Sequence, residues 1–469
     1  MSATPPVSFE RRVALALGDA RLRSALDSAT GRFLTLRAEG LASLPDPEGT
    51  RDRARAIRAE TLAHLDEHLE RFVGHVAAVG GHVHWASDAS EAVRKVLAIA
   101  RGCGAKLAVK SNSMISEEVH LNPALEAAGV RVIESDLGEF IIQLAGETPS
   151  HIVVPAVHKT KEQIGALFHE KLGVPLTHDP AEMARVAREK LREAYLRADM
   201  GISGVNFGVA ETGSIAIVTN EGNASLATTA PRVHVAMMGI ERIVPSLHEL
   251  ATLLRVLARS ATGQKATVYY DLITGPRRAG EPDGPEELHV VLLDNGRSRV
   301  LAGPSAEILY CIRCGACLNA CPVYREIGGH AYGSVYPGPV GAVLMPALEG
   351  IRTWSDLPQA SSLCGACREV CPVRIDIPRM LLQQRHEAAE AGQAPLWARL
   401  GLRVYRIAAL RPWLFRQALR LTRTVTRGLA REGWLRRLPP PLAAWTASRD
   451  FPALARRSFQ EEWRSGRRE

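Results

Sequence analysis

Seven of the eight cysteines in this chain of 469 residues lie in one short segment, between positions 311 and 371. The first four form the motif Cys311-Ile-Arg-Cys314-Gly-Ala-Cys317-Leu-Asn-Ala-Cys321, which is followed by a proline. This C-x2-C-x2-C-x3-C-P spacing is typical of proteins that bind cubane iron–sulfur clusters, because three closely spaced thiolates wrap one cluster while the fourth points away from it. No other feature of the chain restricts its folding as strongly.

A structural zinc site is the main alternative for these cysteines. Tetrahedral zinc usually takes paired C-x2-C knuckles from separate turns, so the third close cysteine of the motif would be redundant. The chain begins MSATPPVSFERRVALAL, without the apolar stretch of a secretory signal, so we expect a cytoplasmic protein with reduced cysteines. The motif therefore favours an iron–sulfur cluster over zinc or disulfides.

A second motif, Cys364-Gly-Ala-Cys367-Arg-Glu-Val-Cys371, repeats this spacing but has Ser361 where the first cysteine would stand. In ferredoxins with two clusters, the fourth cysteine of each motif ligates the cluster of the other motif. This rule predicts two [4Fe–4S] clusters with different ligand sets. The ligands of the first cluster are Cys311, Cys314, Cys317 and Cys371. Those of the second are Cys321, Cys364 and Cys367.

The second cluster would lack one cysteine ligand. Three thiolates can hold a four-iron cluster whose last iron binds a Ser361 oxygen, water or a substrate atom, and they can equally hold a [3Fe–4S] cluster. The sequence leaves these alternatives open. The eighth cysteine, Cys103, lies between an expected helix and an expected strand, a position more typical of a small buried residue than of a ligand.

Upstream of the cysteines, short apolar strands alternate with amphipathic helices. The expected strands are residues 82–86, 106–110, 130–134, 151–157, 214–219, 266–272 and 287–293. The expected helices are most of the first forty residues and residues 51–78, 89–101, 116–128, 137–144, 180–198 and 245–261. This alternation is typical of a parallel sheet covered by helices, so we expect an α/β fold with a parallel-sheet domain.

The chain is expected to consist of four parts, which differ in composition. They are an N-terminal helical segment at 1–50, an α/β domain at 51–300, an α-helical two-cluster ferredoxin-type domain at 301–385, and a helical basic region at 386–469.

The basic C-terminal region accounts for the positive charge of the chain. Residues 401–469 contain sixteen arginines and five acidic residues, whereas the chain as a whole has a net charge of only +8. Arginines there alternate with Trp, Leu and Pro, and there is no recognisable helix-turn-helix, which disfavours a nucleic-acid partner. An anionic membrane surface or an acidic partner suits such amphipathic helices better, and a solvated helix bundle is the alternative.

Two segments that follow expected strands carry polar residues suited to a ligand pocket. One starts at Lys110 and Ser111 and opens an expected helix; the other contains Glu211 and leads through a strand to Glu221. A helix start with hydroxyl groups suits an anion, and a glutamate in a cleft can serve as a base. Equally, Lys110 and Ser111 can cap the helix while the glutamates are solvated or paired. The chain has neither a G-x-G-x-x-G nor a Walker motif.

Several longer segments resemble one known family, lactate utilisation protein B. They are KSNSMISEEVHLNPALEAAG, ESDLGEFIIQL, GVAETGSIAIVTNEGN, GGHAYGSVYPGPVGAVLMPALEG and RDFPALARRSFQEEW. The resemblance implies a LUD-type α/β domain, similar to sugar-phosphate isomerases and CoA-transferases, followed by a two-cluster ferredoxin domain and a basic tail. It also implies that Ser361 belongs to the family pattern.

The same resemblance implies a role in the oxidation of L-lactate to pyruvate, as the electron-transfer subunit of a complex. Its partners would be a cysteine-rich subunit like heterodisulfide reductase and a second LUD protein. Peripheral membrane contact is suggested separately by the composition of the tail. An alternative function is that of a metabolite-binding enzyme, in which the α/β domain carries out the chemistry with an open-site cluster. A third is a redox-sensing regulator, which the composition of the tail disfavours.

Overall fold

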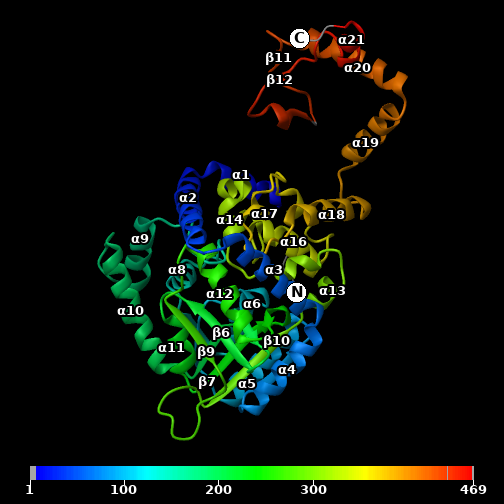
Figure 1. Ribbon diagram of the computed structural model, residues 1–469. Coiled ribbons are helices and arrows are strands. Elements are labelled where there is room, and N and C mark those ends of the chain that lie inside the picture. Colours follow the sequence, from blue (N-terminus) through cyan, green and yellow to red (C-terminus); the bar gives the residue numbers. More distant parts are fainter. Residues whose placement is uncertain (1–6, 441, 467–469) are drawn as a thin grey trace. The chain divides into compact units, whose positions relative to one another are not determined.

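The computed structural model describes residues 7–440 and 442–466 (Figure 1). These residues form two compact units, one that ends at Ala391 and one that begins at Gly392. The first unit contains both the α/β part and all the cysteines.

A six-stranded parallel sheet lies at the centre of the α/β part, which confirms the expected α/β fold. The strands follow the order β1-β10-β7-β4-β2-β3. Their bounds are β1 (His82–Ala86), β2 (Leu107–Lys110), β3 (Arg131–Glu134), β4 (Met200–Gly204), β7 (Val233–Gly239) and β10 (Glu287–Leu293). Because all pairs are parallel, the carboxyl ends of the strands meet at one edge, where α/β proteins bind their ligands.

A second sheet of four short strands packs beside the first and was not expected from the sequence. Its strands, in the order β8-β5-β6-β9, are β8 (Ile243–Val244), β5 (Phe207–Val209), β6 (Ser214–Thr219) and β9 (Tyr269–Ile273). β5 and β8 have only three and two residues, too few for an alternating pattern to be visible.

Helices cover both faces of the parallel sheet. The helices of the α/β part are α3 (Pro47–Ala63), α4 (Leu65–Ala78), α5 (Ala89–Gly102), α6 (Met114–Glu118), α7 (Leu121–Ala127), α8 (Leu137–Ala145), α9 (Lys161–Leu172), α10 (Pro180–Arg197), α11 (Asn223–Thr229), α12 (Leu247–Ala261) and α13 (Arg297–Leu301), with the 3-10 turn η1 (Ile240–Arg242). Ala108 of β2 packs with α5 and α7, whereas its neighbour Val109 packs with α8, α10 and α11. A sheet buried on both faces needs apolar side chains at successive positions, which is the pattern of β7 and β10.

Two expectations about local structure are wrong. Residues 151–157, expected as a strand, form turns, because the His151 ring accepts hydrogen bonds from the backbone N–H groups of Val153 and Val154 at 3.1 and 3.2 Å. The expected helix at 116–128 is split between α6 and α7 at His120, whose φ of 52° is left-handed. The first difference matters for function, since the turn lines a cavity described below.

The cysteine segment is helical, as expected for a ferredoxin-type domain. Its elements are η2 (Ala306–Tyr310), α14 (Ala316–Ala320), α15 (Pro322–Ile327), η3 (His330–Tyr332), α16 (Gly338–Glu349), η4 (Leu357–Gln359), α17 (Ala366–Glu369) and α18 (Ile377–Glu390). The N-terminal helices α1 (Phe9–Gly18) and α2 (Ala20–Ala42) pack on α15, and α2 also contacts α14 and α12 (Figure 1). One continuous apolar core joins this segment to the α/β part, so the cysteine loops have fixed positions relative to the sheet.

The second unit consists of the helices α19 (Leu396–Ala409), α20 (Pro412–Leu429) and α21 (Phe459–Arg464), the 3-10 turn η5 (Leu442–Thr446) and the small strand pair β11 (Trp434–Leu435) and β12 (Phe451–Pro452). Neither α19 nor α20 buries a residue, although both are amphipathic. Among the helices of the described chain, none combines the length and the apolar character that crossing a membrane requires.

Candidate functional site

Four cysteines from two distant loops surround one small cavity in the first unit. They are Cys311, Cys314, Cys317 and Cys371. Burial, together with repulsion from Cys371 and Cys311, raises the pKa of the Cys314 thiol to about 12. Coulombic repulsion between thiolates weakens with distance, so these thiols lie close together. The structure thus brings together the four residues that the sequence assigns to the first cluster.

The other three cysteines form a second group. Burial and repulsion from Cys321 and Cys364 raise the pKa of the Cys367 thiol to about 12. Cys321 and Cys367 are buried, whereas Cys364 is exposed. The second group is therefore more open to solvent than the first.

The loops of the two motifs have the same backbone conformation. Arg313 and Leu363, each directly before the second cysteine position of its motif, have left-handed φ angles of 59° and 57°. Gly315 and Gly365 follow with φ angles of 74° and 86° and begin α14 and α17. Ser361 thus stands at the position of Cys311, and its Oγ accepts a hydrogen bond from the backbone of Leu363 at 3.1 Å.

Arginines surround the first group of cysteines. Arg51 Nη2 donates a hydrogen bond to the carbonyl of Cys371 at 2.9 Å, and Arg242 Nη1 donates one to the carbonyl of Cys311 at 3.1 Å. Arg37 Nη2 donates to the residue before Cys371 at 2.6 Å. These contacts hold both loops at one place and bring positive charge to it.

The environment of these cysteines fits an anionic iron–sulfur cluster. All seven cysteines of the two groups are free thiols, and the buried Nε atoms of Arg37, Arg51 and Arg58 have no hydrogen-bond partner. Buried thiols with raised pKa values stay neutral unless a metal replaces their protons, and buried N–H groups without an acceptor are costly. A cluster ligated by four thiolates carries negative charge, which would balance the nearby guanidinium groups.

Cys103 lies far from this chemistry. It follows α5 and packs against the apolar core between α5 and the sheet, and its thiol donates a hydrogen bond to the Ala100 carbonyl at 3.5 Å. Burial raises its pKa, as for an inert structural cysteine.

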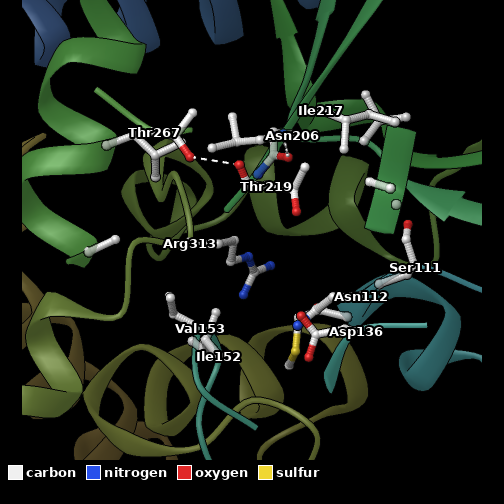
Figure 2. Close-up of a pocket in the computed structure, with 18 of the residues that line it drawn as sticks. Ser111, Asn112, Asp136, Ile152, Val153, Asn206, Ile217, Thr219, Thr267 and Arg313 are labelled. Carbon is white, nitrogen blue, oxygen red and sulfur yellow. Dashed lines mark hydrogen bonds between the residues drawn. The ribbon is translucent and has the colours of Figure 1, made fainter. Parts of the chain in front are cut away.

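A second, larger cavity of about 400 Å³ opens at the carboxyl ends of β2, β4 and β7. Figure 2 shows Ser111, Asn112 and Asp136 on one side of it, and Thr219 and Asn206 on another. The 151–157 turn contributes an apolar wall through Ile152 to Pro155. The cavity therefore has the size and the mixed polar and apolar lining of a site for a small molecule.

The structure separates the four residues that the sequence proposes for a ligand pocket. Ser111 and Glu221 line the large cavity, but Lys110 and Glu211 do not. Glu211 is exposed and accepts a hydrogen bond from the backbone N–H of Leu247 at the start of α12, at 3.2 Å.

Lys110 is enclosed by carboxylates and does not line the cavity. Its Nζ lies 2.9 Å from both Glu117 Oε1 and Glu134 Oε1, and its side chain is fully buried. Burial alone would lower the Lys110 pKa, but Glu134 and Glu117 reverse this effect and raise it. Lys110 therefore serves as a structural counter-ion in the charged state.

Two carboxyl groups meet on the Ser111 side of the cavity. Burial and the neighbouring Glu221 raise the pKa of Asp136 to about 6, and burial raises that of Glu221. Asp136 Oδ1 accepts from the backbone N–H of Glu139 at 3.0 Å and caps α8, and Glu221 Oε2 accepts from that of Leu137 at 3.0 Å. Sequence reasoning missed Asp136, because an Asp before a helix is indistinguishable from an ordinary cap.

Arg313 is the other cavity residue that sequence reasoning missed. It lies between Cys311 and Cys314, and Figure 2 shows its guanidinium projecting into the cavity. The guanidinium carbon is 4.1 Å from the ring centre of Tyr336, within the range of a cation–π contact. No signal in the sequence indicated this role, because Arg313 reaches the cavity only through the packing of the cysteine segment against the sheet.

Comparison with known proteins agrees with both parts of this arrangement. The LUD domain family matches residues 69–293, and the 4Fe-4S dicluster domain family matches residues 307–375. Lactate utilization protein B from Geobacillus thermodenitrificans is 47% identical over 459 residues, which are 97% of this chain and 96% of that protein. Its namesake from Macrococcus caseolyticus is 46% identical over 464 residues, 98% of this chain and 97% of that protein.

The chain belongs to the lactate utilization protein B family. This confirms the resemblance seen in the sequence, and the dicluster domain establishes iron–sulfur cluster binding. Both cysteine motifs lie inside the dicluster match, and the large cavity is built mainly from the LUD match. A DUF162 family protein from Deinococcus radiodurans is 15% identical, with a TM-score of 0.28, and covers 49% of this chain and 98% of its own. A likeness this weak has no bearing on the fold.

Proposed function

We propose that this chain is an electron-transfer subunit that carries two iron–sulfur clusters and acts in the oxidation of L-lactate to pyruvate. The observation that carries the proposal is the grouping of the seven cysteines into a set of four and a set of three. Relatives over nearly the full length are named for lactate utilization, which supports the substrate. Electrons would enter and leave through the clusters, since no described residue outside them is an evident redox group.

The proposed ligands follow from the two groups. Cys311, Cys314, Cys317 and Cys371 would hold a closed [4Fe–4S] cluster. Cys321, Cys364 and Cys367 would hold the second, as a [4Fe–4S] cluster with Ser361, water or a substrate at the fourth iron, or as a [3Fe–4S] cluster. When bound, the clusters supply one-electron transfer, while the arginines around Cys371 stabilise the negative charge.

The physiological role can be tested by growth. In the parent organism, deletion of this gene should abolish growth on L-lactate as sole carbon source while growth on pyruvate stays normal. The wild-type gene should restore growth, a Cys311→Ala gene should not, and Cys103→Ala should restore it fully. Normal growth of the deletion strain on L-lactate, or full complementation by Cys311→Ala, would refute the proposal.

We also propose that the subunit works in a complex with a cysteine-rich subunit like heterodisulfide reductase and a second LUD protein, at an anionic membrane surface. The second unit supports the membrane part of this proposal. Leu396, Trp397 and Trp413 expose 72%, 56% and 60% of their surface, beside the arginines of α19 and α20. Apolar burial and charge attraction would act together on such helices.

Removal of residues 392–469 should abolish membrane binding and leave the cluster spectra unchanged. The first unit has its own core, and every cysteine of the chain lies in this unit. In vesicle co-sedimentation, the intact protein should bind vesicles that contain phosphatidylglycerol and should not bind vesicles of pure phosphatidylcholine. High salt should remove most of this binding. Equal binding by the truncated protein would contradict a docking role for the second unit.

A further inference from the structure

Arg313 reaches the large cavity with one of its nitrogens unused. Its side chain is nine-tenths buried. Nη2 lies 3.8 Å from Glu241 Oε1, whereas the buried Nη1 has no hydrogen-bond partner. A buried guanidinium N–H without an acceptor is costly, so an acceptor supplied by a ligand would be stabilising.

The charges linked to Arg313 do not balance. Arg297 binds Glu118 and Glu241 at 2.8 and 2.7 Å, and Arg242 lies 3.7 Å from Glu241. Three arginines, counting Arg313, thus share two carboxylates at this end of the cavity. These five side chains are therefore net positive and favour an anionic group, while Asp136 and Glu221 line another part of the cavity.

Ser111 offers a second unused group. Its side chain is buried and lines the same cavity, and its Oγ has no hydrogen-bond partner. In Figure 2, Ser111 and Asn112 lie across the cavity from the apolar Ile152 and Val153, and the Arg313 guanidinium lies between these groups. A ligand anchored at Arg313 can therefore meet both polar and apolar groups.

We propose that this cavity binds a small organic monocarboxylate, whose carboxylate group accepts a hydrogen bond from Arg313 Nη1 and whose polar substituent contacts Ser111. A hydroxy acid or an oxo acid meets this description. A carboxylate suits the site better than a phosphate, because the three arginines and two carboxylates have an excess of one positive charge, which a singly charged carboxylate matches and a doubly charged phosphate exceeds. The volume of about 400 Å³ leaves room for ordered water beside a small acid.

The cavity is directly connected to the first group of cysteines. Arg313 lies in the loop between Cys311 and Cys314, and its backbone N–H lies 3.4 Å from Cys311 Sγ as a hydrogen-bond donor. A carboxylate on Arg313 would cancel a positive charge close to the first cluster, which would lower the reduction potential of that cluster. This consequence rests on the proposed function, whereas carboxylate binding itself does not.

The test is calorimetric titration of the anaerobic full-length protein with L-lactate, and with L-lactamide as a neutral analogue of the same shape. L-Lactate should bind and L-lactamide should not. Arg313→Leu should weaken L-lactate binding about tenfold or more, because hydrogen bonds to charged groups contribute this much. Leucine is a matched replacement, since Leu363 has the same left-handed conformation in the other motif.

Two further measurements complete the test. Ser111→Ala should weaken L-lactate binding several-fold with no loss of iron, since Ser111 is remote in sequence from both motifs and makes no hydrogen bond through Oγ. L-Lactate should also shift the electron paramagnetic resonance spectrum of the reduced first cluster in the wild type, and not in Arg313→Leu. Inorganic phosphate should neither bind nor shift that spectrum.

The proposal fails if L-lactate, pyruvate and acetate all leave the calorimetric signal unchanged while both clusters are present and reducible. That result would leave the electron-transfer role intact. It also fails if L-lactamide or phosphate binds as well as L-lactate, or if Arg313→Leu and Ser111→Ala both bind like the wild type. Carboxylate binding that depends on Arg313, in a protein whose clusters accept no electrons, would uphold the site and refute the proposed function instead.

Discussion

Replacement of Cys371 by alanine is expected to destabilise the cluster of the first motif, although Cys371 belongs to the second motif. The structure places Cys371 at the cavity of Cys311, Cys314 and Cys317, and not with Cys364 and Cys367. Loss of one of the four thiolates leaves three, as in the second group, so the first cluster should lose an iron or become as labile as the second cluster. Iron analysis and electron paramagnetic resonance after anaerobic purification would measure the loss.

The matched variant is Cys367→Ala, which removes a cysteine of the same motif from the other group. It should abolish the second cluster and leave the first, so the two variants should lose different spectral components. The Cys103→Ala variant should retain all the iron, because the thiol of Cys103 packs near α5 and away from both groups. If Cys371→Ala and Cys367→Ala lose the same component, each motif binds its own cluster and the crossed ligation is wrong.

The α/β fold could be predicted because most strands of the parallel sheet alternate with amphipathic helices of ordinary length. The expected strands at 82–86 and 287–293 have the bounds of β1 and β10. The two central strands, β4 and β7, were missed. They contain glycines, and each carries one polar residue, Ser203 and His234, which hydrogen-bond each other at 2.8 Å inside the sheet. A pattern of single residues cannot reveal such pairing between strands.

The turn at 151–157 shows how a side chain can override a strand pattern. The residues IVVP are typical of a strand. His151, however, caps two backbone N–H groups and contacts Asn319 of α14 through its Nε2 at 3.2 Å. The segment therefore curls toward the cysteine region instead of joining the sheet, a tertiary effect that the local sequence does not carry.

The candidate sites differed in how much the sequence could reveal. The cysteine motifs have a spacing that few other functions require, so their grouping was predictable. The cavity was predictable only in part, through Ser111 and Glu221. Arg313 reaches the cavity only because the cysteine segment packs against the sheet. Lys110 and Glu134 lie at the ends of the neighbouring strands β2 and β3, which only the fold brings together.

The wild-type chain is expected to bind two iron–sulfur clusters. Seven free thiols in two groups can hold two clusters with seven or eight irons in total, depending on whether the open site holds a [3Fe–4S] or a [4Fe–4S] cluster. The first group has four ligands and the second has three with an exposed Cys364, so the second cluster should be lost first to air or a chelator. Ser361→Cys should slow that loss by completing the ligand set.

The most direct test of the account is the iron and sulfide content of the anaerobically purified full-length protein, combined with redox-titrated electron paramagnetic resonance. About seven or eight irons per chain and two spectral components that reduce separately are the predicted result. Zinc in place of iron, or a single cluster with about four irons, would contradict it.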